Sequence, residues 1–301
     1  MGAQLDPQSR VTFAWLEVTG KCQLQCDHCY ADSGPAGSHG AMTTKEWTNV
    51  IDQLADLGTR MVQFIGGEPT LHRGLPGLVG HALGRGLEVE VFTNLVHVSP
   101  ILWEVFSQPG VRLATSYYSD DAEQHERITR GRRSYERTRS NLVEAVRRSV
   151  PVRVGVIDVD EGQRVQEAVS QLRSLGVEGE VRVDRLRQVG RGVRDGGPEL
   201  DELCGQCGDG RVAIAPDGSV WPCVFSRWLP VGNVREESLV DILTGPRMTQ
   251  TASALAREFA RRPLNPCVPN MCDPQCGPSC SPACRPAGNC TPSGACAPDY
   301  H

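Results

Sequence analysis

The chain has 301 residues, enough to bury one sizeable hydrophobic core and to leave room for a small additional module. Hydrophobic residues make up 39% of it, as in globular proteins, and the formal net charge of -5 gives no general electrostatic reason to bind nucleic acid or an anionic membrane. The first residues lack the apolar stretch of a signal peptide, and no segment approaches the run of about 18 apolar residues that spans a bilayer. We therefore expect a cytoplasmic protein without a membrane segment.

Short β-like runs alternate with helical segments from about residue 11 to 190. The predicted strands cover 13–18, 61–65, 87–94, 111–116, 152–158 and 180–186. The predicted helices cover 43–57, 75–84 and 134–148, with one starting at Ser99-Pro100 and another ending near 175. Thr43 and Glu46 have the spacing of a capping box. Six such units imply parallel strands with right-handed crossovers, either as an open sheet or as a partial barrel.

The pattern changes near residue 195, where Gly and Pro dominate the linker 191–200. We therefore divide the chain into domains 1–195 and 196–301. In the second domain, 211–222 is typical of a β-hairpin with its turn at 216–218, and one amphipathic helix is predicted at about 238–260. After Pro263 the sequence is a tail rich in Cys, Pro and Gly, with almost no large apolar residues.

The 13 cysteines are unevenly placed, with three at 22–29, none at 30–203 and ten at 204–296. In a reducing cytosol such clusters indicate metal binding or catalysis rather than disulfides. The predicted metal ligands are Cys22, Cys26, Cys29, Cys204, Cys207, Cys223, Cys267, Cys272, Cys276, Cys280, Cys284, Cys290 and Cys296.

The first three cysteines form a CxxxCxxC motif directly after the first predicted strand. Three thiolates ligate three irons of a 4Fe–4S cluster and leave the fourth iron open for a substrate or cofactor. The alternative is a structural zinc site with a distant fourth ligand, His28 or His39. A Gly-Gly-Glu-Pro sequence follows the second strand, and the carboxyl ends of parallel strands meet at one edge, so we expect the two motifs to lie together. That placement favours the catalytic cluster.

These residues resemble the radical SAM superfamily, in particular its subgroup with a SPASM or Twitch domain. The resemblance covers essentially the whole chain and implies a partial (β/α)6 barrel of parallel strands, followed by a small Cys-rich iron–sulfur domain. It also implies contacts to S-adenosylmethionine (SAM) from His28, Gly66, Gly67, Glu68, Pro69, Asn94, Ser116 and Arg130. His28 occupies the position of an aromatic residue that lies against the adenine, and the Gly-Gly-Glu-Pro backbone would receive the methionine amino group.

The resemblance implies a radical mechanism as well. The amino and carboxylate groups of SAM chelate the open iron, an electron from the reduced cluster cleaves the sulfonium bond, and the 5′-deoxyadenosyl radical abstracts a substrate hydrogen. An external donor such as flavodoxin or ferredoxin would supply the electron. The sequence identifies no general base.

The Cys-rich tail repeats a simple unit, because each of its seven cysteines is followed two residues later by proline. So polar a segment cannot fold by burial, and metal–thiolate bonds are the expected cross-links. Cys204, Cys207 and Cys223, the last at a fixed spacing after Gly218, match the SPASM pattern, whereas the tail intervals depart from it. Ten cysteines exceed the eight thiolates of two fully ligated clusters. Two auxiliary 4Fe–4S clusters are favoured over one, or over zinc in place of one.

The resemblance favours an enzyme that modifies a ribosomally synthesised peptide in natural-product biosynthesis. Because the first strand begins almost at the N-terminus, a leader-binding domain would have to be a separate protein. One alternative is an oxidoreductase that tailors a small molecule such as a sugar or cyclitol. A second is a non-enzymatic iron–sulfur or zinc scaffold, although a scaffold has no use for an open iron.

Overall fold

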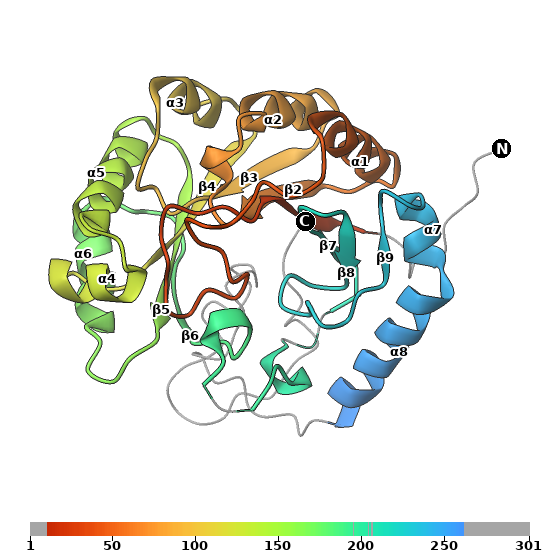
Figure 1. Ribbon diagram of the computed structural model, residues 1–301. Coiled ribbons are helices and arrows are strands. Elements are labelled where there is room, and N and C mark those ends of the chain that lie inside the picture. Colours follow the sequence, from red (N-terminus) through yellow and green to blue (C-terminus); the bar gives the residue numbers. More distant parts are fainter. Residues whose placement is uncertain (1–10, 195, 204, 206, 262–301) are drawn as a thin grey trace.

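The computed structural model describes residues 11–194, 196–203, 205 and 207–261 (Figure 1). Within that part of the chain, no helix is long and apolar enough to cross a membrane. The strands join in one nine-stranded sheet with the order β6-β5-β4-β3-β2-β1-β7-β8-β9. Its first six strands are β1 (Phe13–Thr19), β2 (Met61–Gly66), β3 (Glu88–Phe92), β4 (Val111–Tyr117), β5 (Val152–Asp158) and β6 (Val181–Arg185).

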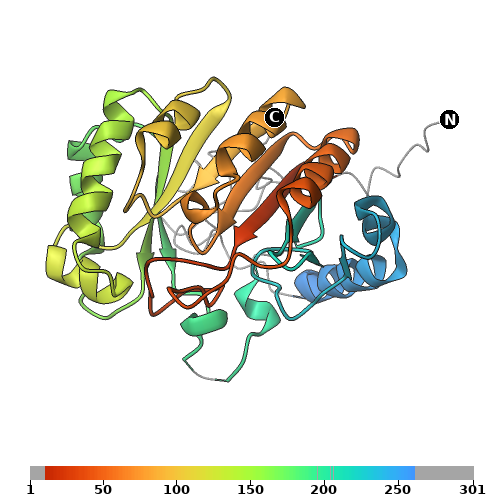
Figure 2. The ribbon, with the colours of Figure 1, turned by 45° about the horizontal axis from the view of Figure 1, so that its top comes forward.

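Strands β1 to β6 are all parallel to their neighbours, and each lies beside the strand that follows it in the sequence. Helices connect them and lie along the outer side of the curved sheet (Figures 1 and 2). They are α1 (Thr44–Asp56), α2 (Leu75–Gly84), α3 (Pro100–Phe106), α4 (Ala122–Thr129), α5 (Ser134–Arg147) and α6 (Val165–Ser174). The predicted partial (β/α)6 barrel is confirmed.

Local sequence signals explain most of these elements. Thr43 caps α1 in a reciprocal capping box with Glu46, and Ser99 caps α3 directly before Pro100, as predicted. Helix α4 was not predicted, because its sequence is too polar to show an apolar period. It begins at Asp121, whose side chain accepts a hydrogen bond from the Gln124 N–H.

Two apolar layers lie on opposite faces of the sheet. Ala14, Leu16 and Val18 of β1 belong to the large cluster under the outer helices, whereas Phe13 and Trp15 belong to a second cluster on the inner face. This division follows from the alternation of side chains along a strand. The inner cluster is completed by residues after 200, so the second part of the chain packs into the open side of the barrel.

A buried ion cluster lies inside the barrel. Glu90 of β3 is fully buried and pairs with Arg112 of β4 and Arg153 of β5, at 2.8 and 2.7 Å. Burial alone would raise the pKa of Glu90, but the charges and hydrogen bonds of the two arginines hold it at about 2. Gln63 of β2 also donates a hydrogen bond to Glu90. The cluster thus joins β2 to β5 across the barrel interior.

The predicted hairpin is formed by β7 (Arg211–Ile214) and β8 (Ser219–Trp221), and β9 (Gly232–Asn233) adds a short third strand. Gly218 at the turn has a φ of +89°, which favours glycine. A feature that the sequence did not predict is that β7 pairs in parallel with β1, Phe13 opposite Arg211. The hairpin therefore extends the barrel sheet beyond β1.

The single helix predicted at about 238–260 is wrong, because the structure has two helices there. They are α7 (Leu239–Thr244) and α8 (Pro246–Arg261). Gly245 between them is extended, with φ -71° and ψ 163°. Proline disfavours a helical conformation at the residue before it and has no N–H to donate, so Pro246 ends one helix and begins the next.

Candidate functional site

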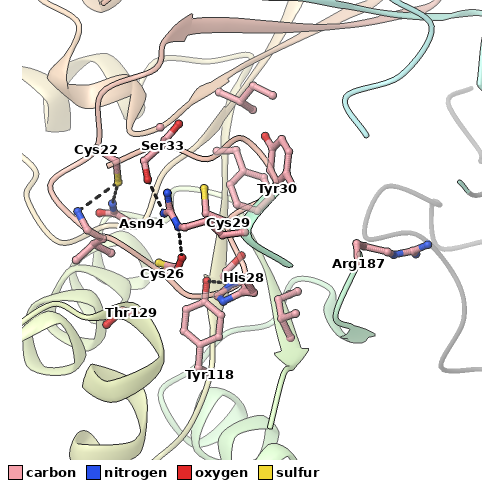
Figure 3. Close-up of a pocket in the computed structure, with 18 of the residues that line it drawn as sticks. Cys22, Cys26, His28, Cys29, Tyr30, Ser33, Asn94, Tyr118, Thr129 and Arg187 are labelled. Atoms are coloured by element: carbon pink, nitrogen blue, oxygen red, sulfur yellow. Dashed lines mark hydrogen bonds between the residues drawn. The ribbon is translucent and has the colours of Figure 1, made fainter. Parts of the chain in front are cut away.

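The three N-terminal cysteines lie on one loop after β1 and line the same pocket (Figure 3). Backbone hydrogen bonds turn the loop: the Cys29 N–H donates to the Cys26 carbonyl at 3.3 Å, and the Cys22 N–H to the Gly34 carbonyl at 3.1 Å. Cys22 is buried, and the other two side chains are partly exposed. The loop therefore presents three sulfurs to a shared space.

Cys22 has two hydrogen-bond donors directed at its sulfur. The Leu24 N–H lies 3.4 Å from Sγ and the Asn94 Nδ2 atom 3.7 Å from it. Burial raises the pKa of the Cys22 thiol to about 12, against a lowering effect of the Leu24 N–H. A bound metal ion reverses this balance, since its charge deprotonates a coordinating thiol. The donors then stabilise a thiolate.

The paired glycines after β2 are required by how closely they approach the cysteine loop. A Cβ on Gly66 would lie 2.3 Å from the Thr19 carbonyl oxygen, and one on Gly67 would lie 2.4 Å from that of Lys21. Gly66 also has a φ of +149°. The Gly67 N–H donates to the Thr19 carbonyl at 2.7 Å. Both glycines line the pocket, so the two motifs lie together.

Glu68 does not line the pocket, although it follows the two glycines. Its buried carboxylate accepts hydrogen bonds from Oγ1 and N–H of Thr70, from Thr93 Oγ1 and from the Asn94 N–H, at 2.7 to 3.1 Å. Burial raises the pKa of Glu68 and the four hydrogen bonds oppose this. Pro69, also buried, begins a short 3₁₀ helix, Pro69–Leu71. Glu68 thus fixes the end of β3 and, with it, Asn94.

His28, Asn94 and Ser116 reach the pocket from three different elements. The His28 Nε2 atom lies 3.0 Å from the hydroxyl oxygen of Tyr118 (Figure 3). Burial, reinforced by the charges of Arg194 and Arg191, lowers the pKa of His28 to about 4, so the imidazole is neutral at pH 7. Tyr118 was missed, but it is two residues from Ser116, a spacing that repeats along one face of a strand.

Arg130 lies outside the pocket. It follows α4 in the left-handed conformation, with a φ of +49°, and its guanidinium pairs with the Asp27 carboxylate. Its side chain is 59% exposed. Among the predicted SAM contacts, the structure thus gathers His28, Gly66, Gly67, Asn94 and Ser116 around the cysteines, but not Glu68, Pro69 or Arg130.

A further part of the pocket lining, here called the aromatic and charged wall, was not predicted. It comes from alternate positions of β3 and β5, from β6 with the segment after it, and from the loop after β8: Phe92, Ile157, Asp184, Arg187, Val224 and Phe225. Arg187 pairs with Asp184 at 3.4 Å, and its guanidinium carbon lies 5.8 Å from the Phe225 ring centroid. This wall combines aromatic and charged groups, and Phe225 brings the second part of the chain to the pocket.

Two of the ten later cysteines lie in the described part of the chain, Cys207 and Cys223. Both are buried in the inner apolar cluster, and the Gly208 N–H donates to the Pro222 carbonyl at 3.1 Å, which ties their two segments together. The predicted ligand Cys204 and those in the tail, Cys267, Cys272, Cys276, Cys280, Cys284, Cys290 and Cys296, lie outside the described residues.

The residues around the pocket fit a cluster with three protein thiolates and a polar small molecule beside it. Ser33 Oγ is buried on the pocket wall and, like Nδ1 of His28, has no hydrogen-bond partner among the described residues. Such atoms are satisfied when a polar ligand binds. In the same part of the chain, no three His, Cys, Asp or Glu side chains are grouped closely enough to hold one metal ion.

Comparison with known families gives two matches. The sequence profile of the radical SAM superfamily matches residues 16–174, which is more than half of the chain. That of the SPASM iron–sulfur cluster-binding domain matches residues 204–281. The predicted family resemblance is confirmed.

Several curated relatives are named PqqA peptide cyclase. That of Bradyrhizobium diazoefficiens is 41% identical over 81 residues, 27% of this chain and 21% of the relative. That of Granulibacter bethesdensis is 32% identical over 116 residues, 37% of this chain and 30% of the relative. Both matches thus span less than a third of the relative's length. The cyclase of Xanthomonas euvesicatoria is 26% identical over 270 residues, 75% of this chain and 72% of the relative.

Solved structures share the fold. SuiB of Streptococcus suis bound to S-adenosylmethionine has a TM-score of 0.68 at 14% identity, over 81% of this chain and 68% of that one. The protein anSMEcpe with bound AdoMet has a TM-score of 0.64 at 13% identity, over 82% and 83%. From the cysteine loop, the barrel and the profile match together, this chain belongs to the radical SAM superfamily and is an enzyme of that family.

Proposed function

We propose that this chain holds a 4Fe–4S cluster on Cys22, Cys26 and Cys29 and uses SAM to abstract a hydrogen atom from a ribosomally made peptide. One observation carries this proposal: the three sulfurs, the paired glycines, Asn94 and Ser116 line one pocket together with the aromatic and charged wall. The peptide part is supported by the relatives named PqqA peptide cyclase. SuiB, whose fold this chain shares, has also been solved with its precursor peptide SuiA.

The chemistry supplied by the bound cofactors is reductive cleavage of SAM to a 5′-deoxyadenosyl radical. The chain itself would hold the cluster and orient SAM beside it. Asn94 and the Leu24 N–H direct hydrogen bonds to Cys22, and Glu68 fixes the backbone of Asn94. Gly66 and Gly67 let the end of β2 approach the cysteine loop closely, and both line the pocket beside the sulfurs.

Polar groups around the pocket would bind SAM, and apolar groups would keep water out. Ser33 and Ser116 line the pocket and would offer hydroxyls to the polar groups of SAM, and the neutral ring of His28, on the same pocket, would stack on the adenine. The apolar part of the lining would exclude water from the pocket and so protect a reactive radical; it consists of Phe92, Ile157 and Phe225.

A substrate would bind in this pocket beside the aromatic and charged wall, where Asp184 and Arg187 form their buried pair. A peptide offers both amide hydrogen bonds and charged side chains to such a wall. We assign no general base among these groups, because the reaction type sets which proton must leave.

The later cysteines are proposed as ligands of auxiliary clusters, with two clusters favoured. Cys207 and Cys223 lie on the side of the pocket that Phe225 also occupies, so an auxiliary cluster there would be close to a bound substrate. Open clusters and free thiols require a reducing compartment, which supports a cytoplasmic location with an external flavodoxin or ferredoxin as electron donor. A separate leader-binding protein is a further proposed partner.

The experiment uses the anaerobically reconstituted full chain with dithionite, SAM and the precursor peptide encoded beside its gene. We expect 5′-deoxyadenosine to form and the mass of the peptide to change, and we expect neither with Cys26→Ala. If 5′-deoxyadenosine forms while the peptide neither changes mass nor takes up deuterium when the reaction is run in D2O, the peptide assignment fails and the radical chemistry stands. If no 5′-deoxyadenosine forms, the whole proposal fails.

A further inference from the structure

The segment after β6 packs tightly against the cysteine loop, and its Arg191 lines the same pocket as the three cysteines. A Cβ on Gly190 would lie 2.4 Å from the Tyr30 carbonyl oxygen and 2.5 Å from that of Cys29. The Arg191 N–H donates to the same Cys29 carbonyl at 3.0 Å. Two stretches of chain that are about 160 residues apart in sequence are thus in direct backbone contact at the third cysteine.

The guanidinium of Arg191 spans the loop with all three of its nitrogens. Nε donates to the Cys26 carbonyl at 3.0 Å, and one terminal nitrogen donates to the Ser33 carbonyl at 2.5 Å. The other pairs with the Asp32 carboxylate at 2.8 Å. Asp32 is 72% exposed, so that ion pair contributes little. The two carbonyl contacts, on either side of Cys29, therefore dominate, and a lysine cannot reproduce this planar fork.

The positive charge of Arg191 also lies at the pocket of the sulfurs. Arg191 lines that pocket together with Cys22, Cys26 and Cys29, and its Nε lies 3.0 Å from the Cys26 carbonyl oxygen. Cys22 instead receives its hydrogen bonds from the neutral groups of Leu24 and Asn94. The loop therefore has neutral donors at its first cysteine and a cation at its second.

The same segment is connected to the second domain. Glu202, two residues before Cys204, accepts hydrogen bonds on its carboxylate from the Gln188 N–H at 3.0 Å and from Arg185 at 3.2 Å. Arg187 donates to its carbonyl at 3.0 Å. The position of Arg191 is thus fixed on both sides, by the cysteine loop and by the start of the second domain.

We infer that Arg191 is a positioning residue for the three-cysteine loop and that its charge raises the midpoint potential of the cluster bound there. The inference rests on the proposed function, because it needs a cluster on Cys22, Cys26 and Cys29. Reduction adds negative charge to a group that three thiolates already surround, and a nearby cation stabilises that added charge. Removing the cation disfavours the reduced form.

The test is a potentiometric titration of the holoenzyme, followed by electron paramagnetic resonance, on wild type, Arg191→Gln, Arg191→Lys and Arg194→Gln. Signals that SAM perturbs identify the catalytic cluster, and those that it does not perturb serve as an internal reference. Arg194→Gln is the control for a neighbouring charge, because Arg194 is exposed and donates to the carbonyls of Asp27, at 3.4 Å, and Arg191, at 3.0 Å, but not to that of Cys26 or Ser33.

For Arg191→Gln we expect the reduction equilibrium of the SAM-sensitive cluster to fall about tenfold, which is about 59 mV for one electron. The reference signals should not move, and Arg194→Gln should shift the potential clearly less than Arg191→Gln does. Arg191→Lys keeps the charge but not the fork, so its potential should stay near wild type while less iron is retained. An unchanged potential in Arg191→Gln, or an equal shift in Arg194→Gln, overturns the inference.

If Arg191→Gln retains no iron, its potential cannot be measured, and the Arg191→Lys variant tests the positioning role instead. Reduced iron retention with a wild-type potential supports the positioning role, and full iron retention overturns it. If wild type itself shows no SAM-sensitive signal, the proposed function has failed, a result distinct from an unchanged potential in a loaded variant.

Discussion

The two described cysteine sites differ in how they are built. Cys22, Cys26 and Cys29 come from one loop and line an open pocket. Cys207 and Cys223 come from two segments and are buried among aromatic and aliphatic side chains of the inner cluster. The first site is held by distant backbone contacts from β2 and from Arg191, whereas apolar packing encloses the second.

The first group of cysteines is therefore accessible to a small molecule, whereas the second is enclosed by apolar side chains. If Cys22, Cys26 and Cys29 hold a cluster, as proposed, three ligands on one loop leave space for a molecule to approach, and catalysis requires such a space. Buried cysteines without an opening suit a structural or electron-transfer role instead. The pair Glu17–Arg227 joins the two regions, at 2.6 Å, because Glu17 lies on β1 and Arg227 lies four residues after Cys223.

The largest expected effect comes from Cys26→Ala. Removing one of three ligands leaves the loop with too few thiolates for the cluster, so 5′-deoxyadenosine formation should fall to background. Chromatography of the reaction with SAM and dithionite measures it. Wild-type turnover by this variant would show that the open site is not the cluster site.

Cys223→Ala should affect the enclosed site alone. We expect reconstituted iron and sulfide to fall by about one cluster, while SAM is still cleaved to 5′-deoxyadenosine. Iron analysis tests the expected loss of a cluster, and the same chromatographic assay tests whether SAM is still cleaved. Loss of SAM cleavage together with the iron would mean that the two sites are not independent.

Glu17→Gln should weaken the connection between the regions. Glu17 is almost fully buried, so the variant leaves Arg227 without its carboxylate, although still 4.4 Å from the Trp221 ring centroid. We expect a loss of about 3 kcal/mol in the free energy of unfolding. Denaturant unfolding of wild type and variant, prepared in parallel, measures it, and a change below about 0.5 kcal/mol would contradict a buried pair.

The smallest effect is expected for Gly67→Ala, which tests the close approach at the open site. The added methyl would overlap the Lys21 carbonyl, and the strain should cost about 1–3 kcal/mol of unfolding free energy. Gly77→Ala in α2 is the control, because a Cβ there meets nothing within 4 Å, and we expect it to stabilise the helix by about 0.5–1 kcal/mol. Equal effects of the two substitutions would argue against the close approach.

Local patterns in the sequence predicted the alternating strands and helices and their parallel pairing, but left an open sheet and a partial barrel as alternatives, and the family resemblance favoured the barrel. The caps Thr43 and Ser99 follow from short-range spacing, and the structure has them as predicted. The pairing of β7 with β1 was not predictable in that way, because a parallel pair is set by packing between segments that are far apart in the sequence.

At the site, too, contacts between segments far apart in the sequence were not predicted. Motif spacing predicted that the cysteines and glycines lie together, but it did not show that Glu68 faces away from the pocket or that Arg130 lies outside it. Arg191 was missed because its contacts to Cys26 and Ser33 cross about 160 positions of sequence. Gly190 beside it offered a signal, since a glycine next to an arginine can mark a close backbone approach.

The most direct measurement of the central claim is 5′-deoxyadenosine formed by the oxygen-protected chain from SAM and dithionite, together with the metal bound at the N-terminal loop. The account predicts iron at that loop and nucleoside formation that Cys26→Ala abolishes and Cys223→Ala preserves. Zinc at Cys22, Cys26 and Cys29, or intact SAM after reduction of the iron-loaded protein, would contradict it.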